Sequence, residues 1–496
     1  MKKNNYILPV INLMIKPVQY IFFVSLLLYS SVLTAQQTDW SEPQKVKDKI
    51  IYSEVIGANN GNYYIIRYNK KSKQQFIIEK YDKTLRLAKK LEFEVAKNIS
   101  VEKILLLHGK IFIFSVTYNS ELKKTQLFVN VFNDNFTAII KDQTLIASDF
   151  KYSNRKNFYI SKDMINNRIL IVYPENTKNN SILYKLSILN TDLQKLYSNS
   201  FVIDTEKNYQ IDQYQLIDST IAIVYKTYKG NSDDPTNERF YLIDFDLMRN
   251  KQTQYKFADD TIFFNNLLIK YDIPNRTLIC SGYFSYLGSE NNAGIAYLKL
   301  FKNTDSAIYR SIRFPDELKN SILGKNNKKE KINSYYPKGI IVRDDGGFLF
   351  IGEYYKVQKE VYTNYSSTSN MYDVKYYYNY GNAMLLSIDP NGKIDWQKVI
   401  RKDQVSMSDD GAFSSLSVAT TDIKVALLYN DISRTRTNLI FNAVEPNNTI
   451  NNYIIVNGNS FNGSLIPKLS KQVGANEIIV PGFENKKGFL FLRIKI

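Results

Sequence analysis

The chain has 496 residues, 44% hydrophobic and 14% aromatic, so its bulk can form a packed core and is not disordered. A single cysteine, Cys280, excludes an intramolecular disulfide, and a single histidine, His108, excludes zinc sites built from several histidines. The formal net charge of +17 favours anionic partners, although the AT-rich codons of Lys, Asn, Ile, Tyr and Phe are an alternative source of both the charge and the 38 tyrosines.

Residues 1–35 are expected to be a secretory signal peptide. Lys2 and Lys3 give a positive start, Tyr20–Leu28 forms an apolar core, and Thr34-Ala35-Gln36 supplies a small-residue cleavage site. The core is shorter than the roughly 20 apolar residues of a membrane span. We therefore expect export to the periplasm or outer membrane, or beyond the cell, with no transmembrane span after cleavage. The Ala-Gln ending resembles signal peptides of Bacteroidota.

From residue 36 onward, short runs rich in β-branched and aromatic residues alternate with turn signals, which predicts strands and no long helix. Four such strands form a group, and groups recur at about 52 to 55 residues. The first group is Ile51–Gly57, Tyr63–Tyr68, Phe76–Tyr81 and Leu85–Val95, and later groups begin near Val101, Asn157, Tyr209, Ile262, Tyr335 and Ala412.

The sixth group carries the clearest motif. It reads KGIIVRDDGGFLFIGEYY and then AMLLSIDPNGKIDWQKVI, with the turn signals Asp345-Gly346 and Asn391-Gly392 between β-rich runs. This pattern resembles a blade unit common in bacterial β-propellers. The resemblance implies an exported all-β propeller of four-stranded blades, matches no characterised family and implies no particular chemistry.

The two ends of the chain are expected to share a blade. The C-terminal segments Leu465–Val473, Glu477–Gly482 and Phe489–Ile496 make only three strands, and Asp39–Val46 is an unpaired strand-like piece. If Asp39–Val46 is the fourth strand of the last blade, the ring closes and loses its exposed edges. Residues 36–496 would then form one propeller of eight blades, or of seven if one group has been divided wrongly. Two stacked β-domains are the competing fold.

Strand order within a blade predicts which face carries the long connections. Second-to-third connections and connections to the next blade share one face, and long loops on a rigid scaffold commonly carry function. Two length outliers, 314–334 and 357–373, fall on that face. The other long connections expected there are 229–237, 285–293, 401–411 and 431–437.

Nine tyrosines between Tyr354 and Tyr380 suggest a recognition surface, since tyrosine offers contact area at low entropic cost. The alternative is a long hairpin whose alternate tyrosines face a neighbour. A basic run, residues 319–331, could contact phosphate-rich or acidic glycan, or be a solvated loop with a short helix that begins near Pro315. The resulting candidate binding residues are Tyr354, Tyr355, Tyr362, Tyr365, Tyr372, Lys325, Lys328 and Lys329.

Acidic pairs in the long connections, Asp233-Asp234 and Asp409-Asp410, could bind Ca²⁺ or act as paired glycosidase carboxylates, but turn chemistry also explains them. His108 is expected in a solvated turn and Cys280 in the core of an inner strand. We find no nucleotide-binding, serine-hydrolase or metalloprotease motif and predict no cofactor, metal or nucleic-acid partner.

The sequence therefore favours a non-catalytic binding or scaffold module of the cell envelope, with a protein or glycan partner at the long-loop face. The alternative is a propeller-fold carbohydrate-active hydrolase or lyase that uses loop carboxylates.

Overall fold

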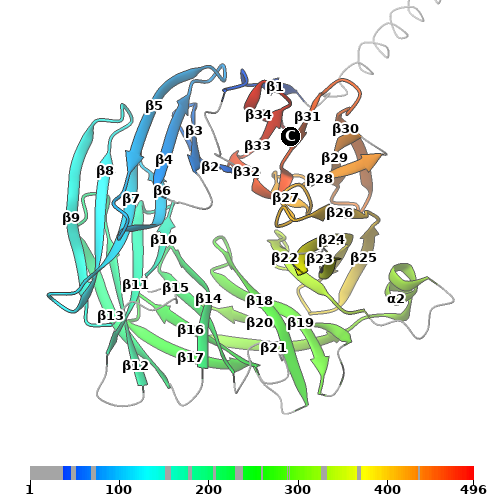
Figure 1. Cartoon of the computed structure of the whole chain (residues 1–496). Coiled ribbons are helices and arrows are strands. Elements are labelled where there is room, and N and C mark those ends of the chain that lie inside the picture. Colours follow the sequence, from blue (N-terminus) through cyan, green and yellow to red (C-terminus); the bar gives the residue numbers. More distant parts are fainter. Residues whose placement is uncertain are drawn as a thin grey trace, which may run out of the picture.

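Eight antiparallel sheets stand around a common axis as the blades of a propeller (Figure 1). The computed structural model describes residues 37–45, 52–68, 74–150, 158–176, 181–204, 208–228, 238–257, 261–287, 289, 291–324, 332–365, 370–433 and 436–496. In blades 1 to 7, the order of the four main strands in space follows their order in the sequence. The predicted all-β propeller and its count of eight blades are confirmed.

Blades 1 to 4 each contain four strands that run from the axis outward (Figure 1). Blade 1 holds β2 (Tyr52–Asn59), β3 (Asn62–Tyr68), β4 (Gln75–Tyr81) and β5 (Leu87–Glu94). Blade 2 holds β6 (Ser100–Leu107), β7 (Lys110–Asn119), β8 (Lys124–Phe132) and β9 (Ala138–Ser148). Blade 3 holds β10 (Tyr159–Asp163), β11 (Arg168–Asn176), β12 (Ser181–Leu189) and β13 (Lys195–Asp204). Blade 4 holds β14 (Asn208–Ile217), β15 (Thr220–Tyr228), β16 (Glu238–Asp246) and β17 (Lys251–Phe257).

Blades 5 to 8 repeat this plan with additions. Blade 5 holds β18 (Ile262–Asp272), β19 (Thr277–Tyr286), β20 (Asn292–Phe301) and β21 (Ser306–Arg313). Blade 6 holds β22 (Tyr335–Val342), β23 (Phe348–Tyr365), β24 (Asn370–Ile388), β25 (Ile394–Ile400) and β26 (Gln404–Met407). Blade 7 holds β27 (Ser417–Thr420), β28 (Val425–Ser433), β29 (Arg436–Val444) and β30 (Ile450–Val456). Blade 8 holds β31 (Gly463–Leu465), β32 (Lys471–Gly474), β33 (Glu477–Glu484), β34 (Gly488–Lys495) and, from the other end of the chain, β1 (Thr38–Trp40).

Two short helices complete the described elements: α2 (Asp316–Leu323), between blades 5 and 6, and the 3-10 helix η2 (Pro467–Leu469), before β32. In the described ranges, no helix combines the length and apolarity that crossing a membrane requires.

The blades are apolar on both faces, which explains the nearly continuous hydrophobic runs in the sequence. Along β7, Phe112 and Phe114 pack into the cluster shared with blade 3, whereas Ile111 and Ile113 pack into the cluster shared with blade 1. Side chains alternate across a strand, so adjacent residues serve different neighbours. The described residues contain eight such clusters, one at each interface between blades.

Pairing between the two ends of the chain closes the ring. Thr38, Asp39 and Trp40 of β1 pair with Ile494, Arg493 and Leu492 of β34, and β1 is the outermost strand of blade 8 (Figure 1). A further bridge joins Gln44 to Phe489. The prediction that Asp39–Val46 supplies the missing strand is confirmed for its described residues.

Arg493 connects this closing strand to the first blade. Its guanidinium is 2.6 Å from the Asp39 carboxylate and donates hydrogen bonds to the Tyr63 hydroxyl at 3.0 Å and the Lys83 carbonyl at 2.8 Å. Tyr63 in turn donates to Glu477 of blade 8 at 2.7 Å. One side chain therefore ties the N-terminal strand, the last blade and the first blade together.

Removal of residues 1–45 should destabilise the whole ring, because the edge of β34 and the Arg493 side chain would lose their partners. We expect the melting temperature to fall by several degrees and the protein to self-associate, as measured by calorimetry and light scattering. Removal of residues 1–35 is the control. A synthetic peptide of residues 37–45 should restore the melting temperature of the shorter protein, and failure of this rescue would contradict closure by strand pairing.

Candidate functional site

The long connections lie on one face of the ring, which we call the long-connection face. Second-to-third and fourth-to-first connections meet there, including 314–334, which contains α2, and 401–411, which contains β26. First-to-second and third-to-fourth turns, such as 108–109, form the opposite short-turn face. The predicted loop 229–237 lies outside the described residues, as do parts of 285–293, 314–334, 357–373 and 431–437, whereas 401–411 is described in full.

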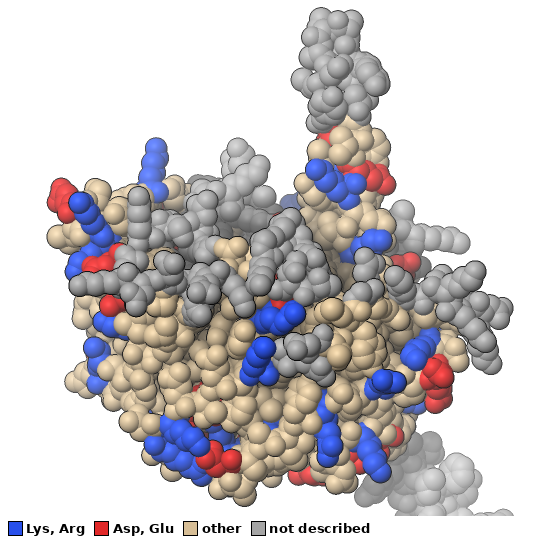
Figure 2. Space-filling view, turned by 90° about the horizontal axis from the view of Figure 1, so that it is seen from below, with Lys and Arg blue, Asp and Glu red and all other residues tan. Residues whose placement is uncertain are grey.

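The segment 357–373 is a hairpin rather than the predicted loop. β23 extends to Tyr365 and β24 begins at Asn370, and their pairing is unbroken from Lys356 with Asn379 to Tyr365 with Asn370. Aromatic and β-branched residues opposite one another favour such extended pairing. We call residues 356–379 the arm. Figure 2 shows a narrow projection from one face of the disc, as expected for this hairpin, and β26 pairs with β24 at its base.

Three of the predicted binding tyrosines belong to the arm. Tyr362 is exposed; its hydroxyl donates to the Glu360 carboxylate and lies 3.2 Å from the Tyr377 hydroxyl, and the Lys375 ammonium lies 4.7 Å from its ring centre. The bond to Glu360 raises the pKa of Tyr362. Tyr365 and Tyr372 lie on the paired strands, but their side chains lie outside the described set.

The other predicted residues have different surroundings. Tyr354 packs edge-on against Tyr335, with ring centres 5.8 Å apart, and half-buried Tyr355 lines a pocket. Lys325, Lys328 and Lys329 lie outside the described residues, so their predicted role stays a prediction.

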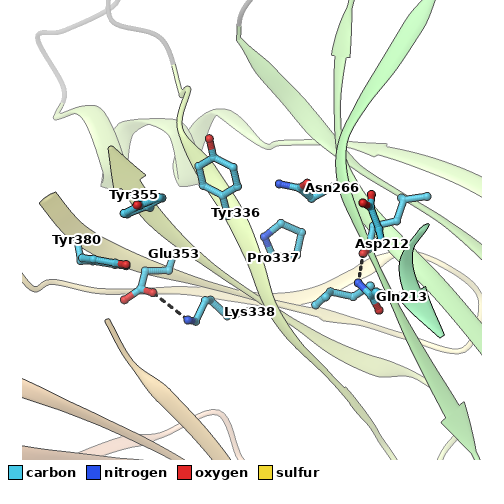
Figure 3. Close-up of a pocket in the computed structure, with 11 residues that line it drawn as sticks. Asp212, Gln213, Asn266, Tyr336, Pro337, Lys338, Glu353, Tyr355 and Tyr380 are labelled. Atoms are coloured by element: carbon cyan, nitrogen blue, oxygen red, sulfur yellow. Dashed lines mark hydrogen bonds and ion pairs between the residues drawn. The ribbon is translucent and has the colours of Figure 1, made fainter. Parts of the chain in front are cut away.

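The pocket has a volume of about 490 Å³ and lies where the innermost strands of blades 4, 5 and 6 approach one another (Figure 3). Figure 3 shows three tyrosines and Glu353 on one side and three polar side chains on the other. Its lining residues are Asp212, Gln213, Asn266, Leu267, Leu268, Tyr336, Pro337, Lys338, Glu353, Tyr355 and Tyr380.

Bulges in the innermost strands supply the polar side chains of this pocket. Asp212 in β14, Asn266 in β18 and Lys338 in β22 are each the extra residue at a register shift. A bulge bends its strand and redirects a side chain out of the regular alternation. A bulge in each of three neighbouring blades therefore directs one polar side chain toward the pocket.

The tyrosine wall is a continuous aromatic surface. The ring centres of Tyr336 and Tyr355 are 5.8 Å apart, and those of Tyr355 and Tyr380 are 4.6 Å apart. Lys468 donates to the Tyr380 hydroxyl at 3.1 Å, and its ammonium lies 5.5 Å from the ring centre. Tyr380 is thus buried and held by Lys468, whereas Tyr336 is 40% exposed.

A buried ion-pair network holds the wall in place. The Glu353 carboxylate is 2.6 Å from the Lys402 ammonium and 3.4 Å from the Lys338 ammonium, and it accepts hydrogen bonds from the Ser415 hydroxyl at 2.6 Å and the Leu416 amide at 2.9 Å. Both carboxylate oxygens are therefore occupied. Burial lowers the pKa of Lys402, and the Glu353 charge opposes this shift.

Asp212 is the carboxyl group of the pocket with the fewest partners. It makes no hydrogen bond or ion pair to another residue in the described ranges. Burial raises the pKa of Asp212 to about 6; the nearby Lys226 opposes this shift and Glu238 adds to it. Near neutral pH this group can accept or release a proton.

Asp409 and Asp410, two of the remaining predicted groups, take part in local hydrogen bonds. Asp409 accepts a hydrogen bond from the Gly411 amide at 2.8 Å, and Asp410 accepts one from the Tyr378 hydroxyl at 2.9 Å; Asp233 and Asp234 are not among the described residues. His108 is exposed in a turn, and Cys280 is fully buried in β19, where burial raises the pKa of its thiol. No cluster of three or more His, Cys, Asp or Glu suited to a metal ion occurs in the described ranges.

Comparisons with known proteins add little to this geometry. No protein-family model matches the chain, and no curated protein matches it. Solved structures similar to it include the β-propeller domain of the Trilobed protease from Pyrococcus furiosus, at 10% identity and a TM-score of 0.35 over 80% of this chain and 94% of that one. The WD40 domain of SCAP from fission yeast is 7% identical with a TM-score of 0.37, over 93% of this chain and 98% of that one. A β-fructofuranosidase from Bombyx mori is 8% identical with a TM-score of 0.31, over 92% of this chain and 93% of that one. The strand pairing itself defines the fold.

The substitution Glu353→Gln should destabilise the protein by about 3 kcal/mol, because it leaves buried Lys402 without its opposite charge. Urea unfolding followed by circular dichroism measures this. The matched control is Asp395→Asn, which removes a partly exposed partner 2.8 Å from Arg343 and should cost less than about 1 kcal/mol. Equal effects of the two substitutions would contradict a stabilising role of the network.

The substitution Asp212→Asn should stabilise the protein above about pH 4, and the gain should be complete above the raised pKa of Asp212. Because that pKa is raised, the folded protein retains a proton that the unfolded chain loses from about pH 4, so wild-type stability falls as the pH rises to about 6. At pH 7.5 the variant should gain on the order of 2 kcal/mol, and near pH 4 the two proteins should unfold alike. A difference that does not change with pH would show that packing, not charge, is altered.

Proposed function

We propose that this protein is a non-catalytic binding module that takes a segment of a glycan into the tyrosine-lined pocket of its long-connection face. The wall formed by Tyr336, Tyr355 and Tyr380 carries this proposal. Sugar rings present C–H groups on their faces and hydroxyls around their edges, so they can pack against the faces and edges of the three tyrosine rings while amide and carboxyl groups bind their hydroxyls. Asn266 and Asp212 supply those groups across the pocket.

The carboxylates of the pocket favour binding over hydrolysis. A glycosidase needs two carboxyl groups that flank the scissile bond, one as an acid and one free to act as a base or nucleophile. Asp212, with a pKa of about 6, has the properties of an acid. Glu353 does not suit the second role, because two ammonium groups, a hydroxyl and a backbone amide occupy its oxygens.

We also propose that the protein works outside the cytoplasm, in the periplasm or at the outer membrane of a bacterium. The lysines, apolar core and Ala-Gln junction of residues 1–36 support export. A glycan of the cell envelope would be the ligand encountered there, and the formal net charge of +17 would aid encounter with an acidic one.

Substitution of Tyr336 or Tyr355 by alanine should weaken glycan binding at least tenfold without loss of the fold, because each removes part of the wall. A panel of soluble envelope oligosaccharides would identify a ligand, and calorimetry would give its affinity. Tyr453→Ala removes an exposed tyrosine of β30 and is the control.

Three results would count against the proposal. They are no binding to any glycan of the panel, wild-type affinity in both pocket variants, and turnover of a bound oligosaccharide that is lost in Asp212→Asn. The last result would instead support a hydrolase. Capture of a protein partner that depends on Tyr362 but not on Tyr336 would place recognition on the arm.

A further inference from the structure

Two lysines of the innermost strands reach toward the same place from opposite sides. Lys162 of β10 donates a hydrogen bond to the Leu106 carbonyl of β6 at 2.7 Å. Lys471 of β32 donates one to the Ile56 carbonyl of β2 at 3.1 Å. Each side chain therefore extends to the neighbouring blade, from blade 3 to blade 2 and from blade 8 to blade 1.

The two carbonyls that they contact belong to adjoining strands. Ile56 and Leu106 pack in one apolar cluster, and a Cβ atom at Gly57 would lie 3.2 Å from the Leu106 side chain. The two ammonium groups consequently converge on one stretch of the ring wall. Exposed Lys103, on β6 three residues before Leu106, adds a third positive charge.

In other blades, neutral side chains form hydrogen bonds with the backbone groups at the unpaired edges of the innermost strands. The Gln213 amide donates to the Leu267 carbonyl and accepts from the Ile269 amide at 3.1 Å. Gln472 likewise donates to the Thr420 carbonyl and accepts from the Thr420 amide at 3.0 Å. Edge satisfaction alone therefore does not require a charge, and the lysines need another explanation.

Electrostatics make this cluster costly in the absence of an anion. Burial lowers the pKa of Lys162 to about 8, and the charges of Lys471 and Lys103 add to this effect. Burial also lowers the pKa of Lys471; Glu54 opposes this shift and Lys103 adds to it. An ammonium group has three donors, and the contact with a carbonyl uses one of them.

We propose that the Lys162 and Lys471 ammonium groups bind a phosphate- or sulfate-type oxyanion, with Lys103 at its edge. A tetrahedral oxyanion can accept several hydrogen bonds at once and neutralises the repulsion among the lysines. Lys162 and Leu106 lie close to first-to-second turns, so this site is nearer the short-turn face than the tyrosine-lined pocket is. It does not depend on the proposed glycan function.

Calorimetric titration of the full chain with inorganic phosphate and sulfate at pH 7 and low ionic strength tests the site. We expect wild-type affinity in the millimolar range or tighter, and at least tenfold weaker binding for Lys162→Gln and for Lys471→Gln. Glutamine is the matched replacement, because Gln213 and Gln472 already show that a neutral amide can occupy such an edge. Lys398→Gln, on the exposed outer strand β25, is the control and should bind as the wild type does.

Further measurements separate a site from simple screening of charge. Phosphate should raise the melting temperature of the wild type more than chloride at equal ionic strength, and this difference should vanish in Lys162→Gln. Affinity should fall between pH 7 and pH 9 as Lys162 loses its proton. Titration with methyl phosphate distinguishes a phosphate ester of a larger molecule from the free ion.

The proposal fails if the wild type binds neither phosphate nor sulfate at 10 mM, or if both glutamine variants bind as the wild type does. Equal stabilisation by chloride and phosphate would also overturn it. If a glutamine variant does not fold, the corresponding methionine variant keeps the same test, because methionine retains the apolar stem without the charge.

Discussion

The constraint on which this structure depends is that every sheet is apolar on both faces and must be covered twice. A four-stranded sheet of this kind cannot stand alone, and an open row of such sheets would expose its two end faces and edges. Closure into a ring removes both ends at once. The interface between blades 8 and 1 is therefore the one that all the others require, and the pairing of β1 with β34 together with Arg493 makes it a shared property of the two ends of the chain.

Ring closure creates a second problem at the axis, where the innermost strands present backbone groups that no further strand can pair. The structure meets it with side chains from neighbouring blades. The side-chain amides of Gln213 and Gln472 form hydrogen bonds with these backbone groups, as a further strand would. Lys162 and Lys471 instead donate to backbone carbonyls from charged ammonium groups. Bulges in these strands add to the variety, because each redirects one side chain. The polar and charged side chains around the axis therefore differ from blade to blade, although the blades share one fold.

This division explains what the sequence could predict. Strand groups, the blade count and the closing strand follow from short runs of β-branched and aromatic residues and from turn residues such as Asp345-Gly346, which are local signals. The hairpin that forms the arm is predicted only as an alternative to a loop, because its polar and tyrosine-rich sequence is equally typical of a loop. The pocket could not be predicted, since Asp212, Asn266 and Lys338 meet through bulges that leave no motif and through a ring that brings residues of three blades together. Tyr355 alone among the predicted binding residues lines it.

The contrast between Glu353 and Asp212 shows how the same residue class takes different roles within one pocket. Glu353 is surrounded by four donors on blades 6 and 7, so its charge holds those blades together and is not free for chemistry. Asp212 projects from a bulge and makes no hydrogen bond or ion pair within the described part of the chain, so burial raises its pKa to about 6 and leaves it responsive to what enters the pocket. A buried carboxyl group that the protein compensates only in part, through Lys226, is better explained by a ligand than by the fold, since an asparagine there would serve stability better.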